Sequence, residues 1–294
     1  MLVRAALIEM GSTSFRLTVN TGQEIDRRSH HLHLGASVSS NGSFTERDIA
    51  AATRVTAEFM TNAKTHNCQR VIAVASHIER EAGCQIKILL PEEENTLTWQ
   101  AVANHFPNTD HLTTIALSGG SLGISSGSLG GKTPAHNFSY PLGTGVLAPR
   151  ASKDGYIDTS TRIRLEHHIA ESLKPAATAI KESGNSSFVI VGGMPLAMTK
   201  LIHTIRRSEV PENLNGLGVD CSDLGHLIKT FSELSIPARL ALPGMSSKRC
   251  EYMPLGVTIL RQTMRSLGVH AAVVSTSGPK ETLLSRLTAE VKAA

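Results

Sequence analysis

Apolar and polar positions divide the first third of the chain into extended segments followed by a helix. Residues 3–9 form an apolar run, residues 11–14 a polar turn, and residues 15–19 alternate as a strand does. A third extended stretch covers residues 23–34. Residues 43–46 (SFTE) have the spacing of a capping box and predict the start of a helix. One face of that helix, at helical period, comprises Ile49, Ala52, Thr56, Phe59 and Ala63.

The rest of the chain continues to alternate between the two patterns. Short apolar runs predict strands at 70–75, 86–90, 113–117, 188–191 and 269–276. Longer periodic segments predict helices at 92–106, 159–181, 195–207, 222–234, 255–267 and 280–292. Pro175 should kink or split the second of these helices. Strands alternating with helices indicate an α/β fold built in layers.

The length of 294 residues suits two domains, each large enough to bury its own core. The Gly/Ser-rich segment 125–133 is the candidate boundary between them. We therefore expect an N-terminal domain over residues 1–127, carrying two glycine loops, and a C-terminal domain over residues 128–294.

A strand that runs into a Gly/Ser turn occurs three times, as IEMGSTSFRL, IALSGGSLGI and VIVGGMPLAM. In the first two cases another strand follows, so a hairpin is expected. A P-loop or dinucleotide-binding fingerprint needs a helix after the turn, which disfavours both. Two glycine hairpins facing each other across a cleft could bind a phosphate from two sides with backbone N–H and hydroxyl groups.

Composition excludes several classes of protein. The net charge of +4 is too small and too scattered for a nucleic-acid surface. No apolar run has the length of a membrane span, and the N-terminus lacks a basic region and a signal-type cleavage context. We therefore expect a cytoplasmic protein that binds neither nucleic acid nor membrane. The four cysteines show no C-x-x-C spacing, which disfavours a zinc or redox motif.

Several segments match, in order and over nearly the whole chain, the motifs of one known family. AALIEMGSTSFRL is similar to D-[IL]-G-S-N-S, VIAVASHIEREA to V-A-T-S-A-x-R-E-A, and ILLPEEENTLTWQAV to I-S-G-x-E-E-A. TTIALSGGSLGI stands where that family has D-I-G-G-G-S-T-E, and FVIVGGMPLAM resembles V-G-x-G-G-T. On these segments the chain resembles the exopolyphosphatase / guanosine-pentaphosphate phosphohydrolase (Ppx/GppA) family.

The resemblance implies a fold and an activity. The fold would consist of two ribonuclease-H-like domains of actin and Hsp70 type with a cleft between them. The activity would be hydrolysis of a phosphoanhydride or phosphoester by activated water. Polyphosphate, guanosine pentaphosphate or a smaller phosphorylated metabolite would be the substrate, and a homodimer would be the assembly.

The departures from the family's motifs concern the metal. The resemblance implies Mg²⁺ as cofactor, with Glu9 as a ligand in place of the motif's Asp. Two further carboxylates of the second loop are replaced by Ala116 and Gly123, so the expected ligand set is incomplete.

The resemblance also assigns candidate site residues. Glu94, and after it Glu93, would activate the water, and Arg80 would bind phosphate through its planar guanidinium group. The phosphate-binding candidates are Gly11, Ser12, Thr13, Ser14, Ser118, Gly119, Gly120, Ser121, Gly192 and Gly193.

Plainer interpretations stay open. A Gly/Ser turn between strands can be a turn only, and three acids at residues 92–94 suit the first turn of a helix. The kept Glu94 and Arg80 favour an enzyme. The absence of carboxylates at Ala116 and Gly123 favours a catalytically impaired homologue that acts as a phosphate or nucleotide sensor or as an interaction subunit.

Overall fold

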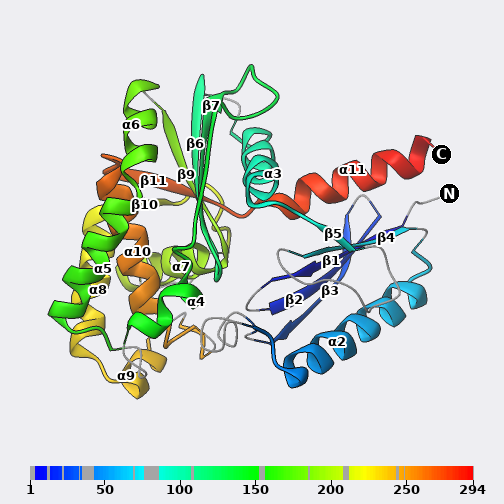
Figure 1. Ribbon diagram of the computed structural model, residues 1–294, viewed down its shortest axis with the longest axis horizontal. Coiled ribbons are helices and arrows are strands. Elements are labelled where there is room, and N and C mark those ends of the chain that lie inside the picture. The colour runs from blue at the N-terminus through cyan, green and yellow to red at the C-terminus, as the bar shows by residue number, and fades with distance from the viewer. Residues whose placement is uncertain are drawn as a thin grey trace.

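Two β-sheets in separate halves of the molecule organise the fold (Figure 1). The computed structural model describes residues 4–11, 14–21, 23–32, 34, 43–68, 70–75, 86–106, 109–151, 156–184, 186–207, 212–242, 245–247 and 249–293. The first sheet has the strand order β3-β2-β1-β4-β5. Its strands are β1 (Ala5–Met10), β2 (Ser14–Asn20), β3 (Glu24–His31), β4 (Arg70–Ala75) and β5 (Ile86–Ile88).

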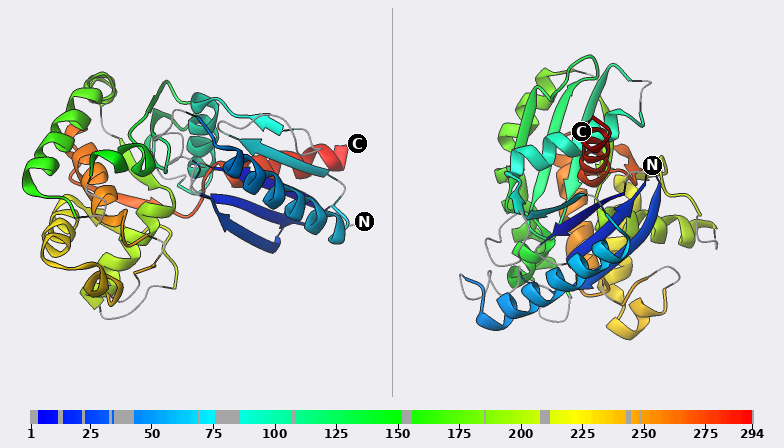
Figure 2. Two further views of the ribbon diagram at one scale, coloured as in Figure 1. Left: turned by 60° about the horizontal axis from the view of Figure 1, so that its bottom comes forward. Right: turned by 90° about the vertical axis from the view of Figure 1, so that its right-hand side faces the viewer.

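The first sheet is covered on both faces. Helix α2 (Glu46–Thr65) packs on one face, where its buried residues Val55 and Phe59 join Ile8 and Leu17 of the sheet. Helices α3 (Pro91–Ala103) and α11 (Pro279–Ala293) lie on the other face, as Figure 2 also shows. The capping box of α2 is formed by Thr45 and Asp48, whose side chains reach each other's backbone N–H groups. The spacing at residues 43–46 therefore predicted the helix correctly and the capping pair wrongly.

The second sheet has the order β10-β11-β9-β6-β7-β8. Its strands are β6 (His111–Leu117), β7 (Leu122–Ser128), β8 (His136–Tyr140), β9 (Ser187–Val191), β10 (Gly218–Asp220) and β11 (Ala271–Ser275). The remaining helices are α4 (Thr144–Leu147), η1 (Ala148–Arg150), α5 (Thr159–Ser172), α6 (Lys174–Glu182), α7 (Gly193–Arg207), α8 (Cys221–Glu233), α9 (Ile236–Leu240) and α10 (Met253–Ser266). As expected, the chain does not continue as one helix over 159–181, and Pro175 lies in the first turn of α6.

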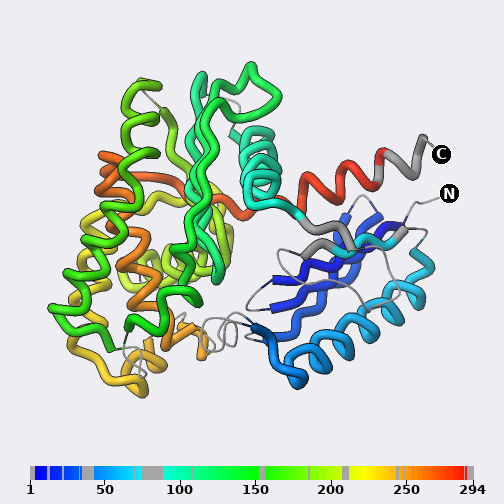
Figure 3. Tube along the Cα trace, viewed as in Figure 1, coloured from blue at the N-terminus to red at the C-terminus, as the bar shows by residue number. Residues whose placement is uncertain are grey.

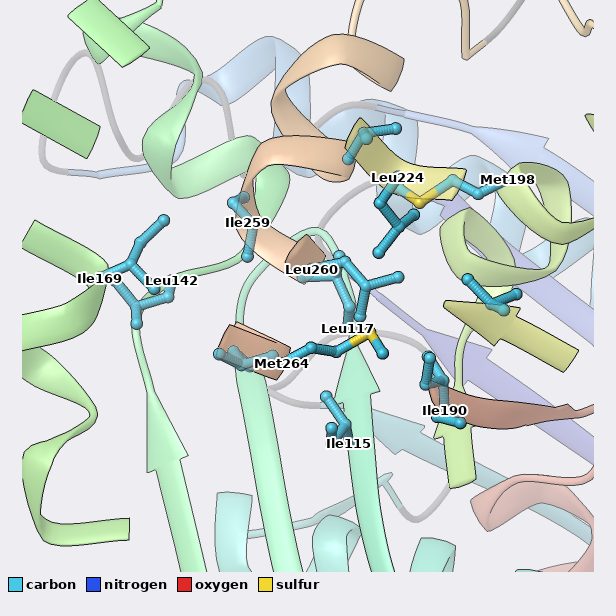
Figure 4. Packing of buried hydrophobic residues seen from close by; sticks show 14 of the residues in the cluster. Ile115, Leu117, Leu142, Ile169, Ile190, Met198, Leu224, Ile259, Leu260 and Met264 are labelled. Carbon is cyan, nitrogen blue, oxygen red and sulfur yellow. The ribbon is translucent and has the colours of Figure 1, made fainter. Parts of the chain in front are cut away.

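The main hydrophobic core fills one face of the second sheet. Side chains of β6, α7 and α10 interdigitate there, among them Leu117, Met198 and Leu260 (Figure 4). On the opposite face Trp99 of α3 is 1% exposed and donates a hydrogen bond from its indole nitrogen to the Leu112 carbonyl at 3.1 Å. Helix α3 therefore packs against both sheets and joins the two halves.

The two sheets repeat one topology. In the first, β1 is antiparallel to β2, β2 is antiparallel to β3, and β1 and β4 are parallel. In the second, β6 is antiparallel to β7, β7 is antiparallel to β8, and β6 and β9 are parallel. The first two glycine segments are hairpins, as their pattern predicted. They are the corresponding hairpins of the two halves, so this arrangement confirms the expected class of duplicated α/β fold.

The expected boundary after residue 127 disagrees with the strand pairing. Strands β6 and β7, which end at Leu117 and Ser128, belong to the second sheet, so the second glycine hairpin lies in the other half of the molecule from the first. Conversely, α11 returns from the second sheet to the first (Figure 3). The Gly/Ser-rich segment 125–133 spans the end of β7 and the turn toward β8, because small polar residues suit a hairpin turn as well as a linker.

Candidate active site

The second glycine hairpin and the loop after β9 lie side by side. Strands β6 and β9 are parallel, so their carboxyl ends, Leu117 and Val191, reach the same edge of the sheet. Gly192 follows with φ of +130°, and a β-carbon there would overlap the Leu117 carbonyl oxygen. Only glycine fits this position. This close approach brings the first turn of α7 next to the hairpin.

The Ser118 side chain forms hydrogen bonds with backbone N–H groups of its own hairpin loop. Its Oγ accepts hydrogen bonds from the N–H groups of Gly120 at 3.2 Å and Ser121 at 3.0 Å. The loop carbonyls of Ser118 and Gly119 accept from Thr144 and Gly145, at the start of α4. The hairpin is thus rigidly supported, and two of the N–H groups expected to bind phosphate are already paired with the Ser118 hydroxyl.

Two carboxyl groups interact electrostatically where α3 packs against the first sheet. Glu9 lies in β1, and Glu94 lies in the first turn of α3. Burial raises the pKa of Glu9, and the positive charges of Arg16 and Lys280 offset part of this effect. Burial, and after it the negative charge of Glu9, raises the pKa of Glu94. A partly buried carboxylate of raised pKa is suited to accept a proton from water near neutral pH.

Two guanidinium groups converge at the start of α7. A β-carbon at Gly193 would lie 3.2 Å from Arg249 Nη2 and 3.8 Å from Arg16 Nη2. Burial, and after it the charge of Arg16, lowers the pKa of Arg249. Within the described part of the chain, neither guanidinium has a carboxylate at ion-pair distance. Two guanidinium groups beside a helix N-terminus offer donors and positive charge of the kind that phosphate anions prefer.

The structure separates the two candidate bases. Glu93 is exposed, and its Oε2 accepts a hydrogen bond from the Leu90 N–H at 2.9 Å, at the start of α3. Glu94 is less exposed than Glu93, and burial, followed by the negative charge of Glu9, raises its pKa. Gly11 donates its N–H to the Ser14 carbonyl at 3.1 Å within the first hairpin. Three further candidates, Ser12, Thr13 and Arg80, lie outside the described residues.

The residues present do not fit the expected magnesium site. Ala116 and Gly123 are directly opposite each other in the β6–β7 ladder and offer no ligand atom. The space next to Gly123 is filled by the Asn95 side chain of α3. Among the described residues no group of three His, Cys, Asp or Glu side chains is placed to hold a metal ion. Glu9 therefore lacks the partner carboxylates that the family's motif provides.

Sequence reasoning missed Arg16 and assigned no role to Arg249. The available signal was weak, because Arg16 reads as an ordinary polar residue of a strand. Its register opposite Glu9 is set by the β1–β2 hairpin, which the pattern did predict. Arg249 belongs to the segment LPGMSSKRCEYMPLGVTIL, in which Arg249-Cys250-Glu251 stands where the family's motif has the triplet R-A-D, and this was a usable signal.

The two halves repeat one α/β topology of actin-like type, and Arg16 of the first half lies near Gly193 and Arg249 of the second. The family model described as "Ppx/GppA phosphatase family" matches residues 18–290, so the chain belongs to that family. Exopolyphosphatase 1 of Mycobacterium tuberculosis is 22% identical over 309 residues, which cover 97% of this chain and 88% of that protein. Exopolyphosphatase 1 of Mycobacterium leprae is 22% identical over 271 residues, which cover 87% and 79%.

Solved structures show the same fold. A crystal structure of an exopolyphosphatase from Cytophaga hutchinsonii superposes with a TM-score of 0.83 at 19% identity and covers 98% of both chains. The Ppx/GppA family member of Aquifex aeolicus has a TM-score of 0.76 at 20% identity and covers 99% of this chain and 98% of that one. No described helix is both long and apolar enough to span a membrane.

Proposed function

We propose that the protein hydrolyses a phosphoanhydride or phosphoester by attack of a water molecule that Glu94 deprotonates. The observation that carries this proposal is the combination of a carboxyl group of raised pKa with two guanidinium groups at the start of α7, neither of which has a carboxylate at ion-pair distance among the described residues. The exopolyphosphatase relatives favour polyphosphate as the substrate class. Guanosine pentaphosphate and smaller phosphorylated metabolites are the alternatives.

Each group has a defined part in the reaction. The water oxygen bonds to phosphorus while the bond from phosphorus to the leaving oxygen breaks, and the proton of the water passes to the Glu94 carboxylate. Arg16, Arg249 and the first N–H groups of α7 hold the phosphate and neutralise charge on its oxygens. Glu9 raises the proton affinity of Glu94 and so improves it as a base.

Inorganic phosphate release tests the proposal. The substrates are polyphosphate, guanosine pentaphosphate, nucleoside triphosphates and phosphomonoesters, each with and without Mg²⁺. Glu94→Gln should reduce release at least 100-fold, consistent with loss of a general base. Glu92→Gln is the matched control, because Glu92 is exposed in the same helical turn. Glu93→Gln distinguishes the two candidate bases and should retain activity. Full activity of Glu94→Gln would refute the mechanism.

A binding protein without turnover is the second candidate function. It is favoured by the missing carboxylates at Ala116 and Gly123 and by the Ser118 hydroxyl, which already occupies the N–H groups of the second hairpin. Tight polyphosphate binding with no phosphate release from any substrate would establish it. A cytoplasmic location and a homodimer are part of the same proposal, and size-exclusion chromatography with light scattering tests the dimer.

A further inference from the structure

The space beside Gly123 of β7 is filled by the side chain of Asn95, which belongs to α3. Gly123 faces α3, and a β-carbon built on it would overlap Oδ1 of Asn95. Any residue other than glycine at 123 would have to displace the Asn95 carboxamide. The two positions, from different elements, therefore compete for one volume.

The Asn95 carboxamide is held firmly in that volume. Asn95 is 6% exposed, and its Nδ2 donates to Asn137 Oδ1 at 3.1 Å and to the Phe138 carbonyl at 2.9 Å. Asn137 in turn donates to the Glu92 carbonyl at 2.8 Å and to Thr96 Oγ1 at 3.0 Å. Asn95 Oδ1 accepts no hydrogen bond from the described residues. These bonds fix the orientation of the carboxamide and leave one neutral oxygen acceptor beside Gly123.

The two positions have changed together relative to the family's motifs. The block I-S-G-x-E-E-A has Ala where this chain has Asn95, and the block D-I-G-G-G-S-T-E has Glu where it has Gly123. In this chain the larger polar side chain therefore stands on the helix and not on the strand. It is a carboxamide, which is neutral at every relevant pH, where the motif has a carboxylate.

We propose that Asn95 and Gly123 form an exchanged pair, in which the Asn95 carboxamide occupies the place of a carboxylate at position 123 and excludes a divalent cation from the second hairpin. Mg²⁺ sites in proteins rely on carboxylates, and Ala116, opposite Gly123, supplies none. The consequence for catalysis rests on the proposed function. If the protein is a hydrolase, Arg16 and Arg249, and not Mg²⁺, neutralise the charge of the phosphate.

A double-mutant cycle tests the shared volume without any measure of activity. Gly123→Ala should lower the thermal unfolding midpoint by at least ~3 °C, because the new methyl group displaces a hydrogen-bonded carboxamide. In the Asn95→Ala background the same change should lower it no further. Gly218→Ala is the matched control, since a β-carbon at this strand glycine meets nothing within 4 Å.

Calorimetric titration with Mg²⁺ tests the exclusion of the cation. The wild-type protein should give no saturable heat. Ala116→Asp/Gly123→Glu restores two carboxylates, and removal of the competitor by Asn95→Ala should tighten Mg²⁺ binding at least tenfold. If Ala116→Asp prevents folding, Gly123→Glu with and without Asn95→Ala gives the same comparison.

Three results would overturn the proposal. The first is an equal loss of stability from Gly123→Ala in both backgrounds, and the second is equal Mg²⁺ affinity with and without Asn95. The third is saturable Mg²⁺ binding by the wild-type protein that Glu9→Gln abolishes. None of these readouts needs turnover, so a failure of the hydrolase proposal would be recognised separately by the absence of phosphate release.

Discussion

Glu9 and Glu94 show how burial changes the proton affinity of an ordinary carboxyl group. A glutamate in water is ionised above a pH of about 4.5 and is a poor base. Removal from water disfavours the charged form and raises the pKa of each group, and the negative charge of Glu9 raises the pKa of Glu94 further.

The charge of Glu9 should therefore control the pH dependence of the reaction. Glu9→Gln removes the negative charge that raises the pKa of Glu94. The acid limb of the profile of kcat/KM against pH should move to lower pH, because Glu94 then ionises more readily. Glu92→Gln should leave the limb in place. A limb unmoved by Glu9→Gln would show that the two carboxyl groups are not coupled.

The same raised pKa values have a cost in stability. Both carboxyl groups have a higher pKa in the folded protein than in the unfolded chain. At a pH between the unfolded and the folded pKa of a group, the folded protein therefore binds more protons than the unfolded chain. Stability should fall as pH rises from about 4.5 through the raised folded values. Glu94→Gln should raise the unfolding midpoint at pH 8 and have little effect at pH 4. Thermal unfolding at both pH values checks this, and a loss of stability at pH 8 would contradict it.

Arg249 carries a half-buried charge, and no carboxylate among the described residues lies at ion-pair distance from it. Charge-assisted hydrogen bonds to phosphate contribute about 1.5–3 kcal/mol each. Arg249→Ala should therefore weaken polyphosphate binding roughly 10- to 100-fold and flatten its salt dependence. Arg249→Lys should restore only part of the affinity, because an ammonium group lacks the planar fork. Arg164→Ala, at an exposed position on α5, is the control for calorimetric titration. An affinity unchanged by Arg249→Ala would remove Arg249 from the site.

At the scale of elements, the turn between β9 and α7 sets the geometry of the site. The turn must bring the helix N-terminus against the Leu117 backbone, and Gly192 makes this contact at a φ of +130°. The helix then begins at Gly193, beside both arginines. Because the strand is followed directly by the helix, the N-terminus of α7, which we propose binds phosphate, has a fixed direction.

Gly192→Ala should combine backbone strain with steric overlap. It should destabilise the protein by at least about 2–3 kcal/mol in urea unfolding and abolish polyphosphate binding. Gly184→Ala separates the two effects, because Gly184 also has a positive φ but a β-carbon there meets nothing within 4 Å. It should cost only about 1 kcal/mol. Equal losses in the two variants would show that the contact with Leu117 is unimportant.

At the scale of the whole molecule, α3 and α11 join the two halves. Leu284 of α11 packs with Leu7 of β1, with Leu97 of α3 and with Leu89, which precedes α3. Closer to the start of α11, Thr282 donates a hydrogen bond to the Leu97 carbonyl at 3.0 Å. The carboxyl end of the chain thus holds α3, and with it Glu94, against the first sheet.

Truncation of this contact should loosen the whole site. Leu284 is 5% exposed, and Leu284→Ala should cost about 2–4 kcal/mol through the cavity that it leaves. Ile163→Ala is the control, since Ile163 is 56% exposed, and its loss should stay within about 0.5 kcal/mol. Urea unfolding measures both. A Leu284→Ala variant as stable as the control would show that α11 is not needed to join the halves.

The sequence determined the local elements and, through its ordered motifs, the family. The glycine hairpins, the split of the helix at Pro175 and most helices were predicted, because turn chemistry and hydrophobic period act between residues close in the chain. The tertiary structure alone decided which sheet each hairpin joins, how Arg16 meets Arg249, and that Asn95 fills the space beside Gly123. These contacts form between segments that are far apart in the chain, and they depend on packing, strand register and shared volume. Local sequence patterns therefore could not predict them.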